Sequence, residues 1–427
     1  MPARDPIALL LAGQYPDPTT GELLAAESRA VVIETSLAGS EADLVAGLGV
    51  GTHVTVISDR NTHAVLGARV ERALSSRFAM QSLVLDAGPR ADDATVERVL
   101  AALSPSTDLV VAVGSGTLND LTKMVAFRRG VPQVIFATAP SMNGYTSLSA
   151  SITTAGIKTS FRTRTPLGVY FDLRVLAAAP ARLIRAGLGD SACRSTAQAD
   201  WLLSHLLLDR PYRETPFALL ADDERDLFGD TRALLAGDLE QMRHLVRTLV
   251  LSGFGMTICD GSYPASQGEH LLSHYVDMMR PSDTLHGEQI AVCTVAMATL
   301  QEQLLARDTP PLLRPSSLRH EDLVRHYGPV IGDACWREFE QKHFDRETTD
   351  ALNMKLARDW DTMRERIRAV SVGATKLRSL LAAAGAPVEP VELGWSAVVM
   401  QHALEHAREI RNRYTFLDLV ADSASAR

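Results

Sequence analysis

Three histidines in the second half of the chain have the spacing of metal ligands. His270 and His274 are four residues apart, so a helix places both on one face. His286 follows sixteen residues after His270. Neutral imidazole is the commonest protein ligand for divalent transition metals. Two imidazoles on one helix and a third from the next segment therefore predict a metalloenzyme, and a hydrogen-bonded helical pair is the alternative.

A carboxylate is the usual complement of such imidazoles, and Asp190 in Gly187-Leu-Gly-Asp190 is the best candidate. We expect Asp190 at the start of a helix, where an aspartate is most often only a cap. The histidines described above make it a candidate ligand.

A second pair, His402 and His406, matches the H-x-x-E-H pattern of one metalloprotease group. It lies among charged residues with no obvious third ligand, so we do not expect a protease.

Strands that alternate with helices are expected over the first 178 residues. The β-branched runs are separated by helix-length segments, which is typical of a parallel sheet with crossover helices. A hairpin or another antiparallel excursion is expected between residues 158 and 175. The five predicted strands are 31–34, 54–59, 81–85, 109–113 and 133–137.

The composition changes after Pro180, where Ala, Leu, Arg and Glu dominate and helical periodicity continues to the end. We therefore predict an α/β nucleotide-binding domain over residues 1–178 and an all-α domain that binds metal and substrate over 179–427. The cleft between the domains is the default active site. The predicted helices include 195–208, 231–252, 286–306 and 350–383.

A glycine-rich turn, Gly114-Ser-Gly116, joins a predicted strand to a predicted helix. Such a turn lets the backbone approach a phosphate, and the helix N-terminus offers N–H donors. An ordinary tight turn is the alternative. Asp59 ends an earlier strand and could accept hydrogen bonds from a ribose diol. The usual dinucleotide fold has this acid after the glycine turn, so Asp59 is either a turn residue or evidence of another strand order.

Composition excludes several classes of partner. The chain has 427 residues, 46% of them hydrophobic, and a net charge of −8 without a basic tract, so nucleic acid is not expected. No apolar run is long enough to span a bilayer. The run 7–12 lacks a cleavage site, so we expect no signal peptide. The cysteines contain no C-x-x-C pair and predict free thiols in a reducing cytoplasm. They are Cys193, Cys259, Cys293 and Cys335.

Five motifs in order resemble the sn-glycerol-1-phosphate dehydrogenases, which belong to the dehydroquinate synthase-like and iron-containing alcohol dehydrogenase superfamily. The resemblance covers about residues 20 to 420, and the segment 410–418 looks like the bacterial branch. The motifs are Gly114-Ser-Gly-Thr-Leu-Asn-Asp120, Thr138-Ala-Pro-Ser-Met-Asn-Gly144, Gly189-Asp190, Glu269-His270-x3-His274 and His286-Gly-Glu288.

This resemblance implies a role for each matching residue. Asp190, His270 and His286 would bind one divalent metal, zinc or nickel with iron possible. Asp190 and His274 would be catalytic, and together with Asn143 they would contact the substrate. The adenosine ribose would lie on Asp59, and NAD or NADP would occupy a site along two turns. The implied cofactor-binding residues are Asp59, Gly114, Gly116, Thr117, Leu118, Asn119, Asp120, Thr138, Ala139, Pro140, Ser141 and Ser147.

The implied activity is hydride transfer between NAD(P)H and dihydroxyacetone phosphate, a small phosphorylated ketone, by a cytoplasmic homo-oligomer. Asp59 suits a free ribose hydroxyl and favours NAD, and Arg60 beside it leaves NADP open. The substrate phosphate needs a cation. The candidates are Lys158, Arg162 and Arg164.

Two alternatives stay open. The family usually has an aspartate where this chain has Asn143, which suits a metal-dependent alcohol or polyol-phosphate dehydrogenase with another substrate. A sugar phosphate cyclase, which is a lyase, is disfavoured. Dehydroquinate synthases use a glutamate ligand with a lysine three residues later, and this chain has Asp190 and Cys193. Iron-dependent alcohol dehydrogenases place a histidine four residues after the ligand aspartate, where Arg194 stands here.

Overall fold

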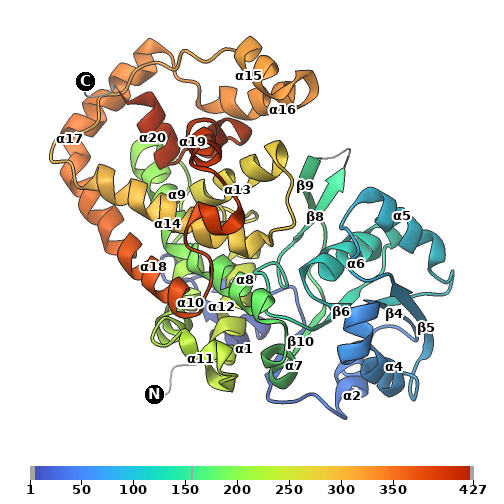
Figure 1. Cartoon of the computed structure of the whole chain (residues 1–427). Coiled ribbons are helices and arrows are strands. Elements are labelled where there is room, and N and C mark those ends of the chain that lie inside the picture. Colours follow the sequence, from blue (N-terminus) through green and yellow to red (C-terminus); the bar gives the residue numbers. More distant parts are fainter. Residues whose placement is uncertain (1–4, 155–156, 424–427) are drawn as a thin grey trace. The chain divides into compact units, whose positions relative to one another are not determined.

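A computed structural model describes residues 5–154 and 157–423 (Figure 1). Contacts between residues group the chain into two compact units. One unit, here called the sheet unit, comprises Met1–Ser191 and Glu214–Gly261. The other, the helical unit, comprises Ala192–Arg213 and Ser262–Arg427. The two domains predicted from the sequence, 1–178 and 179–427, stay a prediction, because helices from beyond residue 178 are grouped here with the sheet.

The sheet unit is built on six parallel strands. All five predicted strands are confirmed, and a sixth lies between two of them. In spatial order the strands are β3 (Ala30–Glu34), β10 (Gly168–Asp172), β7 (Gln133–Ala137), β6 (Leu109–Gly114), β4 (His53–Asp59) and β5 (Ala79–Leu85). Strand β4 therefore neighbours β6, and the carboxyl ends of β4, β6 and β7 meet at one edge.

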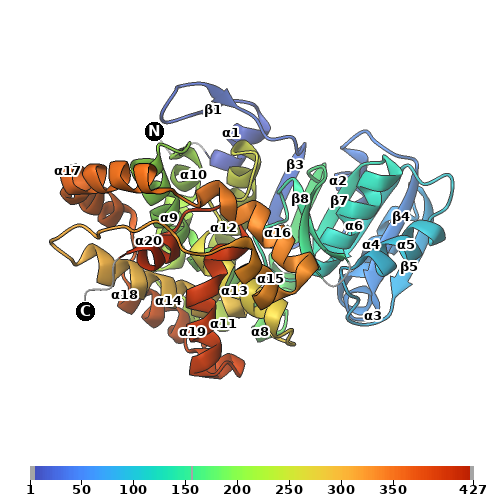
Figure 2. The ribbon, with the colours of Figure 1, turned by 90° about the horizontal axis from the view of Figure 1, so that it is seen from above.

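Helices cover both faces of this sheet, which explains why its strands are apolar throughout. Helices α2 (Glu41–Ala46) and α4 (Ala68–Leu74) pack with one set of strand residues, including Val111. Helices α5 (Asp93–Ala102) and α6 (Gly116–Arg129) pack with the alternate set, including Val110. Figure 2 shows these helices around the sheet. Successive strand residues point to opposite faces, so both sets are buried.

The antiparallel excursion is offset from its prediction. The hairpin is formed by β8 (Ser149–Thr154) and β9 (Ile157–Arg162), so its first strand precedes the predicted range of 158–175. Residues 168–172, predicted within that range, instead form the parallel strand β10. The reason is burial, because every residue of β10 is buried and makes a strand with two covered faces.

Every described secondary-structure element after Asp172 is helical, so the predicted fold class, α/β followed by all-α, is confirmed. The helices predicted over 195–208 and 286–306 are α9 and α14. The stretches 231–252 and 350–383 each contain two helices. Gly237, at φ 81°, separates α11 from α12, and α18 starts after Gly373. In the sheet unit these helices are α7 (Leu173–Ala177), α8 (Ala181–Ala192), α10 (Thr215–Leu227), α11 (Arg232–Leu235) and α12 (Leu239–Ile258).

The helical unit has its own apolar core, to which most of its helices contribute. Its bounds are α9 (Arg194–Leu208), α13 (Gly268–Met279), α14 (His286–Leu305), α15 (His320–Tyr327), α16 (Pro329–Phe339), α17 (Arg346–Val370), α18 (Ala374–Ala383), α19 (Ala397–His406) and α20 (Phe416–Asp422).

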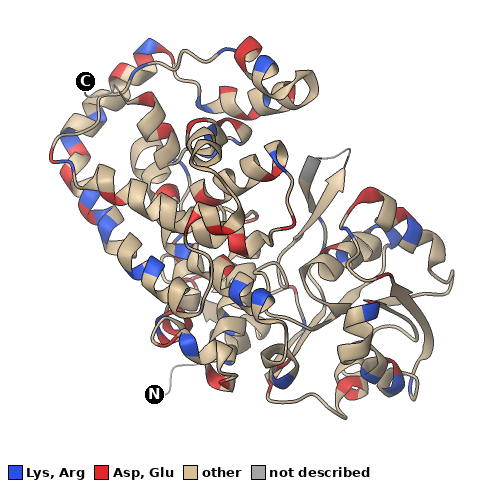
Figure 3. Ribbon diagram, in the orientation of Figure 1, with Lys and Arg blue, Asp and Glu red and all other residues tan. Residues whose placement is uncertain are grey.

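Charges of both signs are interspersed along the helices (Figure 3). Within the six sheet strands, all of them described, the charged residues are Glu34, Asp59 and Asp172. Each is the last residue of its strand, so acidic side chains gather at the carboxyl edge. None of the helices in the described chain is both long and apolar enough to cross a membrane.

Candidate metal and cofactor site

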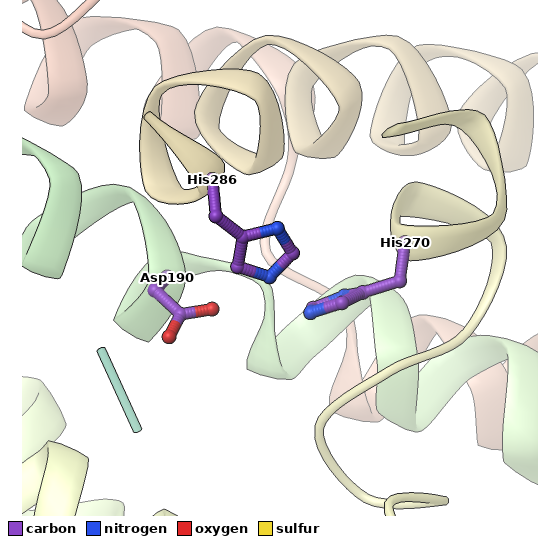
Figure 4. Close-up of side chains that lie close together, drawn as sticks. All are labelled: Asp190, His270 and His286. Atoms are coloured by element: carbon purple, nitrogen blue, oxygen red, sulfur yellow. The ribbon is translucent and has the colours of Figure 1, made fainter. Parts of the chain in front are cut away.

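Asp190, His270 and His286 meet around one point. Each offers one ligand atom, and the three atoms lie within 4.8 Å of one another. Asp190 and His270 are buried, with 2% and 5% of their surface exposed, and His286 is partly buried. Figure 4 shows the three side chains pointing toward one another from three separate helices. The structure therefore brings Asp190, His270 and His286 together.

The three histidines lie on two helices, and the second begins at the predicted residue, His286. His270 and His274 lie in α13, and His286 is the first residue of α14. The ring centroids of His270 and His286 are 5.1 Å apart, and those of His274 and His286 are 5.9 Å apart. His274 thus lies beside the triad, although the group of three converging ligand atoms does not include it.

The position of Asp190 corrects one expectation. Asp190 lies near the end of α8, not at the start of a helix, so it is not a cap. The glycines before it suggested a helix start, but they lie inside α8. A side chain on Gly187 would put its Cβ 1.6 Å from the Pro140 carbonyl oxygen. Gly187 therefore permits α8 to pack directly on the Pro140 backbone, a contact between residues far apart in sequence.

A buried glutamate orients His270. Oε1 of Glu269 lies 2.9 Å from Nδ1 of His270 and also accepts a hydrogen bond from the Gln267 N–H at 2.8 Å. Burial alone raises the pKa of Glu269, but the hydrogen bonds that it makes with His270 and with the Gln267 N–H outweigh burial and lower the pKa. An acid on one ring nitrogen sets the tautomer and leaves Nε2 for a metal. Sequence reasoning missed this role.

A second set of possible ligand atoms, from Cys193, Glu269 and His270, also lies within 4.8 Å. Glu269 is already bonded to His270, to Gln267 and to Thr196 Oγ1 at 3.2 Å. The Cys193 thiol lies 3.6 Å from the Ala265 carbonyl oxygen. In this set Glu269 therefore serves as the hydrogen-bonding partner of His270. Cys193 and the other three cysteines are free thiols, as predicted.

The backbone of Asn143 is bonded to Asp190. Its N–H donates to Asp190 Oδ2 at 2.8 Å, so the residue implied to contact substrate lies directly beside the candidate metal ligand. The loop around Asn143 is held by α12. Thr146 Oγ1 donates to the Val250 carbonyl at 2.7 Å, and Thr257 Oγ1 donates to the Thr146 carbonyl at 3.2 Å.

Lys123 is a second residue that sequence reasoning missed. It lies in α6 with 1% of its surface exposed, and its Nζ donates to the carbonyls of Gly144, Ser147 and Ser149 at 2.6, 2.9 and 3.2 Å. Burial lowers its pKa to about 8, although Asp120 acts in the opposite direction. The motif Asp120-x2-Lys123 was the available signal. Lys123 links the helix after the glycine turn to the loop that carries Asn143.

The glycine turn and the second turn lie side by side. Strand β6 ends at Gly114, α6 begins at Gly116, and the Thr138 N–H donates to the Gly114 carbonyl at 3.0 Å. A Cβ on Gly114 would lie 2.3 Å from Leu118, so the turn requires glycine. The side chains of Leu118 and Asn119 are buried. Their side chains therefore cannot contact a pyrophosphate, and the Asn119 N–H already donates to the Ser115 carbonyl at 2.9 Å.

Two implied cofactor residues also have structural partners. Asp120 accepts hydrogen bonds from Asn119 Nδ2 at 3.2 Å and from the Ser151 N–H at 3.1 Å. Buried Ser147 donates to the Gly144 carbonyl at 3.0 Å. Both residues therefore help to hold the turn-and-loop structure. The remaining residues of these two turns, Thr117, Ala139, Pro140 and Ser141, lie on the same two segments.

Asp59 caps a short helix, α3 (Arg60–Thr62), at the carboxyl end of β4. Its Oδ1 accepts the Thr62 N–H at 2.8 Å, and Thr62 Oγ1 accepts the Asp59 N–H at 3.0 Å. The turn role that the sequence left open is thus observed. The strand order also places Asp59 next to β6, so an acid that precedes the glycine turn in sequence neighbours it in the sheet.

The three cations considered for the substrate phosphate differ. Arg162 forms an ion pair with Asp260, and Arg164 is exposed. The side chain of Lys158 lies outside the part of the chain that the structure describes. The ion pair already compensates the charge of Arg162.

The donor set fits a divalent transition metal. One carboxylate and two imidazoles are the usual ligands of catalytic zinc sites, which keep further positions for water or substrate. The buried acid behind His270 is the expected support for such a ligand.

Comparison with known proteins agrees with this arrangement. The sequence profile of iron-containing alcohol dehydrogenases matches residues 32–180. The chain is 30% identical to a glycerol-1-phosphate dehydrogenase [NAD(P)+] of Bacillus velezensis over 87% of this chain and 86% of that protein. It is 33% identical to one of Pyrococcus furiosus over 64% of this chain and 78% of that protein.

The fold has solved counterparts. The crystal structure of a probable glycerol dehydrogenase from Sinorhizobium meliloti superposes with a TM-score of 0.57 at 19% identity, covering 92% of this chain and 97% of that one. At this identity the likeness concerns the fold alone. It agrees with the dehydroquinate synthase-like architecture expected from the sequence.

Proposed function

The chain belongs to the glycerol-1-phosphate dehydrogenase family, and from this premise we propose that it transfers a hydride between NAD(P)H and dihydroxyacetone phosphate, giving sn-glycerol 1-phosphate. The observation that carries the proposal is the convergence of three ligand atoms within 4.8 Å, beside a loop held to Asp190 by the Asn143 N–H. In the reaction a ketone gains the hydride and one proton, and the reduced nicotinamide becomes oxidised.

Asp190, His270 and His286 would hold one divalent ion. Such an ion, zinc or nickel with iron possible, would supply a Lewis acid that stabilises negative charge on a carbonyl oxygen. Asp190 would bring the negative charge to the site. Its Oδ2 accepts the Asn143 N–H, which fixes the orientation of the carboxylate. Glu269 would hold His270 in one tautomer.

His274 and Asn143 would position the substrate. His274 is partly buried, and its ring centroid is 5.8 Å from that of His270. We propose that His274 donates the proton that the substrate oxygen gains, either directly or through a water molecule. Asn143 would hydrogen-bond a substrate hydroxyl as a neutral group, and its side chain adds no negative charge beside Asp190.

The carboxyl edge of β4, β6 and β7 would hold the cofactor. Within the motif from Gly116 to Asp120, the backbone N–H groups of the first helical turn, Gly116 to Leu118, suit a pyrophosphate at the start of α6. Asp59 suits the ribose diol next to that turn and favours NAD, with NADP accepted through Arg60. Thr138 to Ser141 and Ser147 would line the remainder of the cofactor site.

The experiment is metal analysis paired with a spectrophotometric assay of both glycerol phosphate enantiomers. We expect about one equivalent of a divalent metal and NAD(P)-dependent oxidation of sn-glycerol 1-phosphate, with little on the 3-phosphate. Metal removal should abolish activity, and re-addition of zinc or nickel should restore it. Activity that survives complete metal removal, or reaction with neither enantiomer, would refute the proposal.

Asn143 supports a second candidate, a metal-dependent dehydrogenase that acts on another alcohol or polyol phosphate. A panel of ketones with NADH and NADPH distinguishes the two. If dihydroxyacetone phosphate is the substrate, Asn143→Asp should retain that preference. If another ketone is preferred and Asn143→Asp shifts the preference toward dihydroxyacetone phosphate, the second candidate is correct.

We also expect a cytoplasmic homo-oligomer, a dimer or larger. The resemblance supports the homo-oligomer. The four free cysteine thiols support a reducing cytoplasm. Light scattering of the purified chain tests the oligomer, and a monomer at assay concentration would contradict it.

A further inference from the structure

The segment between α19 and α20 carries two arginines without a carboxylate partner. Arg413 has 8% of its surface exposed, and its guanidinium donates to Ser262 Oγ at 2.7 Å. Its Nη1 is buried and makes no hydrogen bond to any residue in the ranges 5–154 and 157–423. Arg411 is partly buried and likewise forms no ion pair with the described residues.

Other buried cations in the same unit show what is unusual here. Lys342 lies 2.8 Å from the Asp418 carboxylate, and Arg408 lies 2.7 Å from that of Asp422. Buried charges are normally paired in this way because an unpaired one loses its hydration without compensation. Arg413 is buried in the same unit without a carboxylate partner that would compensate the lost hydration.

The two arginines are two residues apart in the chain, and Arg411 has an extended backbone, with φ −151° and ψ 158°. The electrostatics agree. Burial, followed by the charge of Arg411, lowers the pKa of Arg413 to about 9. Burial also lowers the pKa of Arg411, and the nearby Glu338 only partly offsets it. The charges of Glu269 and Glu338 act in the opposite direction at Arg413 but do not outweigh burial and the charge of Arg411.

This region adjoins the loop that leads into α13. Arg413 binds Ser262 in that loop, and its guanidinium carbon lies 5.1 Å from the centroid of the Tyr263 ring, which is 41% exposed. Six residues after Tyr263 comes Glu269, which orients His270 and contributes to the electrostatics at Arg413. Ser262, Tyr263 and Glu269 therefore connect Arg413 to the segment that leads into α13.

We propose that Arg411 and Arg413 bind the phosphate group of the substrate. Guanidinium forks match phosphate oxygens in two parallel hydrogen bonds, and a dianionic phosphate would supply the missing charge. The inference rests on the proposed function and deepens it by naming the residues that select a phosphomonoester over a neutral ketone. It replaces Lys158, Arg162 and Arg164 as candidates for that role.

The test uses Arg411→Gln, Arg413→Gln and Arg413→Lys in the full-length chain. The matched control is Arg358→Gln, which removes an exposed arginine paired with Asp359 in the same unit. The ratio of kcat/KM for dihydroxyacetone phosphate to that for unphosphorylated dihydroxyacetone should fall roughly 10- to 100-fold in the Gln variants, the usual effect of losing a charged hydrogen bond. Arg413→Lys should fall less, because it keeps the charge and loses the fork.

A second measurement does not depend on turnover. Inorganic phosphate, compared with chloride at equal ionic strength, should raise the Tm of the wild type and of Arg358→Gln. Its apparent Kd should increase roughly tenfold or more in Arg411→Gln and Arg413→Gln. Phosphate can also bind the glycine turn at the start of α6, so the difference between variants is what reports on the arginines.

The outcomes separate this inference from the proposed function. If the wild type reduces dihydroxyacetone phosphate but the variants keep the wild-type ratio and the wild-type response to phosphate, the arginine site is wrong and the function stands. If the wild type turns over no phosphorylated ketone but the variants lose phosphate binding, the function is wrong and the anion site stands. Should Arg413→Gln fail to fold, Arg411→Gln and Arg413→Lys decide the question.

Discussion

Helices α13 and α19 carry the same spacing of histidines and use it differently. In α13, His270 and His274 lie with His286 in a cluster whose ring centroids are 5.1 to 5.9 Å apart. In α19, the rings of His402 and His406 are 6.3 Å apart. His406 instead stacks on His326 of α15 with centroids 4.1 Å apart, and its Nδ1 lies 3.0 Å from the Glu409 carboxylate.

In each helix one histidine has a carboxylate on its Nδ1, Glu269 for His270 and Glu409 for His406, so the acid does not distinguish them. What differs is the rest of the surroundings. His270 has another imidazole and a carboxylate within ligand distance, whereas neither histidine of α19 belongs to a group of three ligand atoms in the described part of the chain. His326 is engaged with the Tyr275 hydroxyl at 3.0 Å. Two histidines on one helical face therefore do not make a metal site by themselves, and the ligands that join His270 come from two other helices.

The strongest way to break this comparison is to remove a ligand from the α13 site. Asp190→Asn and His286→Ala should lose bound metal and lower kcat/KM at least about 1000-fold, because they remove several kcal/mol of charge stabilisation. Metal content by atomic emission and the NAD(P)H assay measure both effects. Matched circular dichroism spectra control for folding, and a variant with full activity and no metal would contradict the assignment.

A smaller effect is expected behind the ligand. Glu269→Gln should weaken metal affinity about 10- to 100-fold, because the carboxylate on Nδ1 sets the tautomer and basicity of His270. Competition with a chelator of known affinity measures the change. The matched control is Glu405→Gln in α19, an exposed residue, which should leave metal affinity unchanged. Equal affinities in the two variants would mean that Glu269 does not act through His270.

The histidine stack of α19 should respond to pH. The Glu409 hydrogen bond raises the pKa of His406, whereas burial, and then the charge of His406, lower that of His326. Protonated His406 therefore stabilises the folded state fully below pH 6.5, the pKa of histidine in the unfolded chain. This stabilisation is lost as the pH rises through the raised pKa of His406 in the folded state. Neutral His326 stabilises it above 6.5, and this is lost as pH falls toward the lowered value.

The free energy of unfolding should thus contain a contribution from this stack that is greatest between the two pKa values, around 6.5. We expect it to be about 0.5 kcal/mol, since both rings are partly exposed. The difference in urea midpoint between wild type and His406→Gln, followed from pH 5 to 9, isolates it. Tyr275, Glu405, Glu409 and His402 also face these rings and are unchanged in that pair. A pH-independent difference would contradict the assignment.

The smallest effect is expected at His402. It is exposed, so His402→Ala should change stability by less than about 0.5 kcal/mol and leave metal content and kcat/KM within about threefold. Loss of activity with intact metal would reopen the H-x-x-E-H pattern as a functional site.

Local sequence patterns were sufficient for many elements. Buried strands such as 109–113 and 133–137 were predicted because a sheet covered on both faces requires continuous apolar runs. The helical face of His270 and His274 follows from their spacing. The glycine turn at Gly114 follows from its place between strand and helix, and Leu118 leaves no room for a side chain there.

Other features were out of reach of these patterns. Asp190 was expected at a helix start, yet it lies near the end of α8, in which Gly187 packs against Pro140. Strand β10 was placed in a hairpin because nothing near it in sequence shows that two faces cover it. Lys123 and Glu269 gave little signal, because the carbonyls and the ring that they bind are identified only once the chain is folded.

The sequence by itself determined the periodicities, the spacing of the histidines and the residue types able to hold a metal and a nucleotide. These depend on neighbours within a turn of helix or a strand. The tertiary structure decided which groups meet, as when the Asn143 N–H binds an aspartate 47 residues away, and which charges stay unpaired, as at Arg413. The reason is physical: burial and pairing free energies depend on atoms brought into contact by the whole fold, which no local pattern specifies.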